Sequence, residues 1–123
     1  MLEEGLVLKN GNKFIIKYSD KGEIIWAKQI EGVNINSGIP TIDGGLLIGG
    51  SFIGNIELEN GTNFNARDKD GIIIKYEKSG KMEWARQIIG NNYDSITTIA
   101  QISNGSIVVG GNFFRPLKIS FTI

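Results

Sequence analysis

Three acidic residues near the middle of the chain have a spacing that could bind a cation. Asp68, Asp70 and Glu77 stand where the third, fifth and twelfth positions of an EF-hand loop would be. The sixth position is glycine, as that loop requires, but the first is Ala66, which has no oxygen-bearing side chain. No helical pattern flanks the segment. We therefore predict no metal site, and Asp70 followed by Gly71 indicates a turn that enters a strand.

Catalysis would have to rely on carboxylates, because the chain contains no His and no Cys. Thiol nucleophiles, Ser-His-Asp triads and ordinary zinc sites are therefore excluded. The acids lie mostly in turns or alternate outward along extended segments, as Glu57 and Glu59 do, which is typical of solvated charge. We predict no catalytic residue and no cofactor. A carboxylate-dependent hydrolase or lyase that uses Asp68, Asp70 and Asp94 is kept as an alternative.

Two glycine doublets, Gly49-Gly50 and Gly110-Gly111, could be taken for a phosphate-binding loop. Neither is followed by Lys-Ser or Lys-Thr, and neither opens a helix. Glycine near the end of a strand more often marks a bulge or a close approach of two backbones, and we expect one of these here.

The elements that position these residues are organised by an internal repeat. FIIKYSDKGEIIWAKQIEG at 14–32 matches IIIKYEKSGKMEWARQIIG at 72–90 without a gap, at an offset of 58 residues. DGGLLIGGSF at 43–52 matches NGSIVVGGNF at 104–113 at an offset of 61. We call two residues that are related by these offsets repeat equivalents.

Local patterns within the repeat predict strands and essentially no helix. Apolar and aromatic residues recur with a period of two, as in IIWAKQI and MEWARQI. Turn signals such as SDKG, EKSG, DGG and SNG separate the segments and are typical of tight antiparallel hairpins. The expected all-β chain has strands at 14–18, 24–30, 39–42, 46–52, 72–76, 82–88, 96–102 and 106–113.

One part of the repeat carries a family resemblance. The string DGIIIKYEKSGKMEWARQI at 70–88, followed by a short apolar segment, the turn SNG and IVVGGNF, resembles the bacterial β-propeller repeat known as SBBP. The resemblance covers nearly the whole chain. It implies β-propeller-like blades of four antiparallel strands, with one complete central blade and a second blade split between the termini. It implies little about activity, because propellers host many functions.

On this interpretation residues 1–123 form a single domain of two propeller-type repeats: a half-blade at 6–32, a full blade at 33–90 and a half-blade at 91–123. A closed propeller needs at least about four blades, and this chain supplies two. We expect terminal half-blades of neighbouring copies to pair and close a ring, which makes a homo-oligomer, a dimer or trimer. A fragment of a longer propeller and two sheets packed alone are the alternatives, and Met1 with two complementary halves favours the ring.

Six aromatic residues occupy equivalent positions in pairs: Trp26 with Trp84, Tyr18 with Tyr76, and Phe52 with Phe113. A cation, Lys28 or Arg86, follows each Trp on the same strand face. Recurrence at one repeat position indicates a structural core between neighbouring sheets, with the cation stem over the ring. A Trp that binds a sugar or a base is the alternative.

The longest predicted links between strands are 33–38, 53–71 and 91–95, and in an up-and-down blade they emerge together; we call this surface the long-loop face. Equivalent residues differ most in these links, whereas the strands match. Scaffold positions repeat and binding positions need not, so we predict that the face binds a partner, ordinary polar loops being the alternative. The candidate partner-binding residues are Phe64, Asn65, Arg67, Asn91, Asn92, Tyr93 and Asp94.

Charge and the amino terminus bear on partners and location. The formal net charge is zero, so the chain has no bulk electrostatic footprint for nucleic acid or an anionic membrane, and we expect neither as a partner. MLEEGLVLKNGNK lacks the basic and apolar regions of a signal peptide. We expect a cytoplasmic protein, or an extracellular one if the sequence has been trimmed.

These observations predict a non-catalytic recognition or assembly module that binds a protein partner through the long-loop face. Small size and a composition rich in Ile, Asn and Lys lead to a further hypothesis, an anti-CRISPR-like phage or mobile-element inhibitor of a host defence enzyme. A carbohydrate-binding propeller lectin, with one sugar per blade, is the alternative.

Overall fold

The computed structural model describes residues 13–89 and 94–113 of the chain. Within these ranges all regular structure is β-strand, which confirms the prediction of an all-β chain. These ranges accordingly contain no helix of the length and apolarity that crossing a membrane requires.

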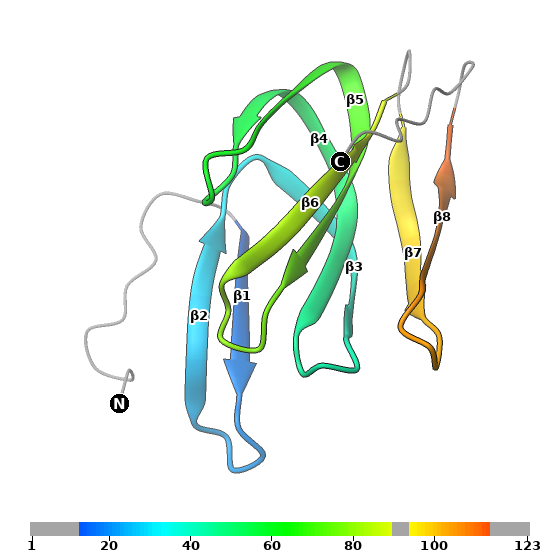
Figure 1. Cartoon of the computed structure of the whole chain (residues 1–123). Coiled ribbons are helices and arrows are strands. Elements are labelled where there is room, and N and C mark those ends of the chain that lie inside the picture. Colours follow the sequence, from blue (N-terminus) through cyan, green and yellow to red (C-terminus); the bar gives the residue numbers. More distant parts are fainter. Residues whose placement is uncertain (1–12, 90–93, 114–123) are drawn as a thin grey trace.

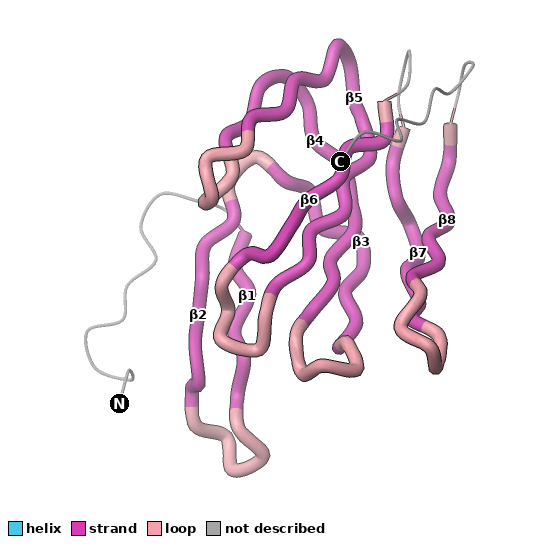
Figure 2. Tube along the Cα trace, viewed as in Figure 1, coloured by secondary structure: helices cyan, strands magenta, loops and turns pink. Residues whose placement is uncertain are grey.

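Three antiparallel sheets follow one another along the described chain and lie side by side (Figure 1). The first sheet has two strands, the central sheet four and the third sheet two, each in sequence order, and every pairing is a hairpin or a direct return (Figure 2). The strands are β1 (Lys13–Tyr18), β2 (Ile24–Ile30), β3 (Val33–Pro40), β4 (Leu46–Glu57), β5 (Asn63–Tyr76), β6 (Met82–Ile88), β7 (Ser95–Gln101) and β8 (Ile107–Asn112).

The tight turns between paired strands share one backbone pattern. In each, a glycine N–H donates to the carbonyl three residues earlier, as Gly80 does to Glu77 at 2.9 Å. Gly80 has a φ of 92°, and its repeat equivalent Gly22 has a φ of 83°. Side chains with a Cβ rarely adopt this left-handed conformation, so the sequence signals SDKG and EKSG place these turns correctly.

The central sheet is buried on both faces. Toward β1–β2 it presents the first core, which includes Ile48, Ile74 and Tyr76 and also takes in Ile30 of β2. Toward β7–β8 it presents the second core, where Leu47 and Ile73 contact Ile96 and Ile99 of β7. Strand β5 is accordingly buried without interruption from Asp70 to Tyr76, which is typical of a strand that is covered on both sides.

Two of the predicted links are strands, and their assignment as loops was wrong. Residues 33–38 belong to β3, and 53–71 is mostly the extended hairpin of β4 and β5. Amides and glycines in these segments resemble a loop composition, yet apolar residues alternate with them. Ile56, Leu58 and Ala66 point into the first core, so pairing continues beyond Phe52. Gly54, with a φ of 72°, follows the register shift that bends the hairpin.

The glycine doublets mark close approaches of two backbones, as the sequence indicated. A Cβ on Gly50 would overlap the carbonyl oxygen of Asn34, and one on Gly111 would overlap that of Ser95. The register of β3 with β4 shifts between Ile35 and Ser37, beside this approach. The strands can therefore pair this closely only because Gly50 and Gly111 have no side chain.

Replacing Gly50 with Ala should destabilise the fold by about 1–3 kcal/mol, because the new methyl group meets backbone that cannot rotate away. Gly38→Ala is the matched control, since its nearest neighbour would lie at 3.5 Å, an ordinary contact. Urea unfolding followed by circular dichroism measures both. Equal midpoints for the two variants would contradict this explanation of the doublet.

Candidate functional site

The repeated aromatic residues have unequal environments in the two repeats. Tyr76 and Phe52 of the central sheet are each 2% exposed. Their equivalents in the outer sheets, Tyr18 and Phe113, are 56% and 63% exposed. The same residue types at the same repeat position are thus buried where a neighbouring sheet covers them and exposed where no described sheet does.

Trp26 packs between the first sheet and the central one. Its Nε1 donates to the carbonyl oxygen of Lys78 at 3.1 Å, and a Cβ on Gly80 would lie 2.9 Å from the indole ring. Lys28 places Nζ 4.4 Å from the centre of the Tyr76 ring and 2.6 Å from Glu59 Oε1. The indole and its neighbouring cation are therefore engaged in contacts between sheets.

Trp84 is the equivalent of Trp26. It lies on the face of the central sheet that is turned toward the third sheet, where it is half-buried against the second core. The guanidinium carbon of Arg86 lies 5.2 Å from the centre of its ring. Gly22 is the equivalent of the glycine that contacts Trp26, and no described atom lies within 4 Å of the position of a Cβ there. Trp84 and the 19–22 turn thus have the same residue types as Trp26 and the turn at Gly80, which form a contact between two sheets of this chain.

The four described residues of the predicted partner-binding set differ in burial. Phe64 packs on the first core with its ring centroid 6.1 Å from that of Phe52, and Asp94 is 1% exposed. Asn65 and Arg67 are exposed on β5. Asn91, Asn92 and Tyr93 lie outside the described residues. The exposed pair, Asn65 and Arg67, lies on the outer side of the β4–β5 hairpin.

That outer side of the β4–β5 hairpin, formed by Ile53, Asn55, Glu57, Asn63, Asn65 and Arg67, is called the hairpin face below. Asn55 pairs directly with Asn65 across the two strands, and Ile53 is 67% exposed. Gln87 of β6 donates to the carbonyl oxygen of Asn65 at 2.9 Å and to Asp70 Oδ2 at 2.7 Å. Polar and buried apolar residues alternate along these strands. Recognising the segment as a hairpin from its sequence would therefore also have placed Ile53 and Asn55 on its outer side.

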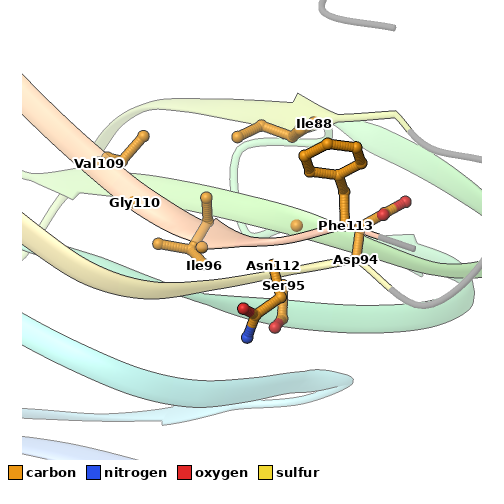
Figure 3. A pocket seen from close by; sticks show the side chains of 10 residues that line it. Ile88, Asp94, Ser95, Ile96, Val109, Gly110, Asn112 and Phe113 are labelled. Carbon is orange, nitrogen blue, oxygen red and sulfur yellow. The ribbon is translucent and has the colours of Figure 1, made fainter. Parts of the chain in front are cut away.

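An apolar cavity of about 160 Å³ lies between the central and third sheets (Figure 3). Ile88 forms one wall, Ile96 and Val109 another, and the ring of Phe113 and Asp94 stand at one end (Figure 3). The repeat pattern did not indicate it, because a cavity depends on how two sheets approach each other.

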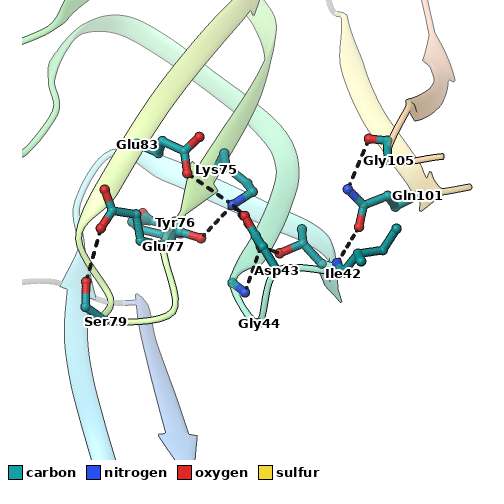
Figure 4. Close-up of polar contacts among 12 residues, drawn as sticks. Ile42, Asp43, Gly44, Lys75, Tyr76, Glu77, Ser79, Glu83, Gln101 and Gly105 are labelled. Atoms are coloured by element: carbon teal, nitrogen blue, oxygen red, sulfur yellow. Dashed lines mark hydrogen bonds and ion pairs between the residues drawn. The ribbon is translucent and has the colours of Figure 1, made fainter. Parts of the chain in front are cut away.

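A buried cation joins the turn between β3 and β4 to strand β6 at one end of the central sheet (Figure 4). Lys75 Nζ donates to Asp43 Oδ2 at 3.0 Å and to Glu83 Oε1 at 3.3 Å. Burial alone would lower the pKa of Lys75, but the hydrogen bonds to the two carboxylates outweigh it and raise that pKa above its ordinary value. A nucleophilic lysine needs the opposite shift, so Lys75 is suited to a structural role.

Asp43 is held as a carboxylate. The Thr41 hydroxyl, the Lys75 ammonium and the Gly45 N–H all donate to it, in that order of influence, and lower its pKa to about 2. Nearby, the N–H of Ile42 donates to Gln101 Oε1 at 2.7 Å, which ties this turn to the third sheet (Figure 4).

Of the acidic residues with the EF-hand-like spacing, Asp68 and Asp70 lie on β5 and Glu77 follows its last residue. An extended strand does not curl its side chains around one ion, and Asp70 accepts the hydrogen bond from Gln87. Across residues 13–89 and 94–113, no three acidic side chains come close enough together to form a metal-binding group.

Comparison with known proteins adds one similarity. No protein-family model matches the chain. The chain is 28% identical over 110 residues to the uncharacterized WD repeat-containing protein L264 of Acanthamoeba polyphaga mimivirus. The match covers 81% of this chain and 8% of that protein, so the chain spans less than a tenth of the relative's length. This similarity suggests a repeat, propeller-like family.

The Asp43 carboxylate should contribute to stability in a pH-dependent way. Its pKa is about 2 in the folded chain, against 3.8 for an unperturbed aspartate such as the unfolded chain contains. Its contribution is therefore present above pH 3.8 and is lost as pH falls toward 2. Asp43→Asn should lower the melting temperature at neutral pH and flatten its decline over that acid range. Asp20→Asn, in the exposed 19–22 turn, is the control; identical pH profiles for Asp43→Asn and the unmodified chain would contradict the account.

Proposed function

We propose that the chain is a propeller-type scaffold that binds a protein partner. The central sheet is its complete blade, and the two-stranded sheets are halves of another. The observation that carries the proposal is the repeated use of equivalent side chains between successive sheets. The WD repeat-containing relative supports it, because such repeats build propeller blades.

Equivalent positions make both contacts between sheets. Ile15 of β1 packs on the first core, and its equivalent Ile73 of β5 lies in the second core. From the facing side, Ile48 of β4 lies in the first core and its equivalent Val109 of β8 packs on the second. Each sheet thus presents one kind of face to the sheet before it and another to the sheet after it. That is the arrangement by which blades follow one another in a propeller.

We infer that the partner binds at the hairpin face. Arg67 and the paired Asn55 and Asn65 offer several hydrogen-bond donors, and exposed Ile53 adds an apolar contact. The Gln87 hydrogen bond to Asn65 ties the hairpin to β6, which lowers the cost of ordering it when a partner binds. Arginine and amides around an apolar residue are a composition that protein interfaces use.

The other hypotheses have less support. Trp26 uses its ring and its N–H within the fold, which leaves it poorly placed to stack on a sugar. The lectin and the inhibitor of a defence enzyme stay predictions from the sequence.

Charge reversal on the hairpin face should weaken partner binding. The chain would be captured with its partners from the source cell, a partner identified by cross-linking to Asn63→Cys, and the affinity of the purified pair measured. Arg67→Glu should weaken that affinity by roughly 10–100-fold, a loss of about 1.4–2.8 kcal/mol that is usual for an interfacial Arg.

Lys21→Glu makes the same charge change in the exposed 19–22 turn and serves as the control. An affinity that Arg67→Glu leaves unchanged, or that Lys21→Glu lowers as much, would place the partner elsewhere and overturn this assignment.

A further inference from the structure

Among the described strands, the two outer sheets have complementary edges without a pairing partner. Within the described residues β1 pairs only with β2, and β8 pairs only with β7. Their equivalents in the central sheet, β5 and β4, pair with each other over the full length of the repeat. An unpaired edge presents a row of free N–H and carbonyl groups that a matching strand can complete.

We propose that β8 of one copy of this chain pairs with β1 of a second copy, so that the two halves form a complete blade. This inference rests on the propeller-type scaffold proposed above and names a second copy of the chain as the occupant of the open edge. The contact is heterologous, since each copy uses a different sheet on each side.

The repeat fixes the register of the proposed pairing. In the central sheet Leu47 is the partner of Lys75, and their equivalents are Val108 of β8 and Lys17 of β1. The same offsets pair Ile107 with Tyr18 of the second copy and Gly110 with Ile15 of the second copy. Val108 is 55% exposed in the single chain, whereas Leu47 is fully buried, as a missing neighbour on that side would explain.

The side chains on both sides of the proposed contact are the repeat equivalents of side chains that already form a contact between two sheets of the single chain. Lys28 lies over the Tyr76 ring in the single chain, and the equivalent contact places Arg86 over Tyr18 of the second copy. Trp26 packs on the turn at Gly80, and the equivalent places Trp84 on the open turn at Gly22 of the second copy. In the assembly, each of these residues gains the contact that its repeat equivalent already makes within the single chain.

The cavity between the central and third sheets lies beside this contact. The proposed register sets Phe14 of the second copy opposite Gly111, which lines the cavity. The Phe14 ring is 62% exposed in the single chain. The cavity measures about 160 Å³, and an apolar cavity of about 150 Å³ is large enough to hold benzene, so the ring has a suitable space to enter.

A designed disulfide tests the register directly, because residues 1–123 contain no cysteine. Val108→Cys with Lys17→Cys should form a disulfide under mild oxidation, since paired strand residues have the Cα spacing that the bond needs. Within one chain the central sheet separates these positions, so the bond can form only between copies (Figure 1). Covalent multimers on a non-reducing gel are expected.

Val108→Cys with Lys13→Cys is the matched control, because Lys13 lies on the same strand face but four residues out of register. Its cross-linking should be at least tenfold slower. Equal rates for the two pairs, or no multimers from the first pair, would overturn the proposed pairing.

Mass in solution tests the same proposal without cysteines. At micromolar concentration, light scattering should give a small multiple of 13.5 kDa, the dimer or trimer mass of a ring with four or six blades. Tyr18→Asp should weaken the association at least tenfold, whereas Ile53→Asp, at a similarly exposed residue on the hairpin face, should keep the assembly mass.

A stable 13.5 kDa species for the unmodified chain would overturn the second-copy inference. The two proposals fail separately. A monomer whose partner binding still depends on Arg67 would keep the scaffold function and lose the assembly. An assembly whose partner binding does not depend on Arg67 would keep the pairing of copies and overturn the assignment of the hairpin face.

Discussion

The central sheet has two apolar faces, and it is stable only if another sheet covers each of them. Its first face buries Ile74 and Tyr76 against β1–β2, and its second buries Leu47 and Ile73 against β7–β8. Burying such side chains stabilises a fold by about 1.5–3 kcal/mol each, so both two-stranded sheets are needed to hold the central one. The stacking order of the three sheets follows from this requirement.

The same requirement leaves the outer sheets incomplete. Each covers the central sheet with one face and has a second face and an edge that the described chain does not cover. Tyr18, Val108 and Phe113 are exposed for this reason, although their equivalents in the central sheet are buried. Binding to other molecules is therefore an expected property of the scaffold, whether the partner is a different protein at the hairpin face or a second copy at the sheet edges.

Much of the fold could be predicted from local sequence, because its strands and turns are encoded locally. Strands β2 and β6 match the predicted ranges, and the glycine turns appear where the motifs indicated. Burial was not predictable in the same way. Tyr18 and Tyr76 follow nearly identical strings, and only the neighbouring sheet distinguishes them. The amide-rich composition of 53–71 predicts a loop, because it masks the alternation of Ile56 and Leu58, which are buried.

Amide hydrogen exchange along β8 tests the central claim most directly. If β8 is completed by a strand from a second copy, successive amides from Ile107 to Asn112 should all be protected, to a degree close to those of β4. Protection should fall when the chain is diluted below the dissociation constant of the assembly. If every second amide of β8 exchanges at the rate of an open edge, at concentrations where the chain is fully folded, the half-blades do not pair and the account is wrong.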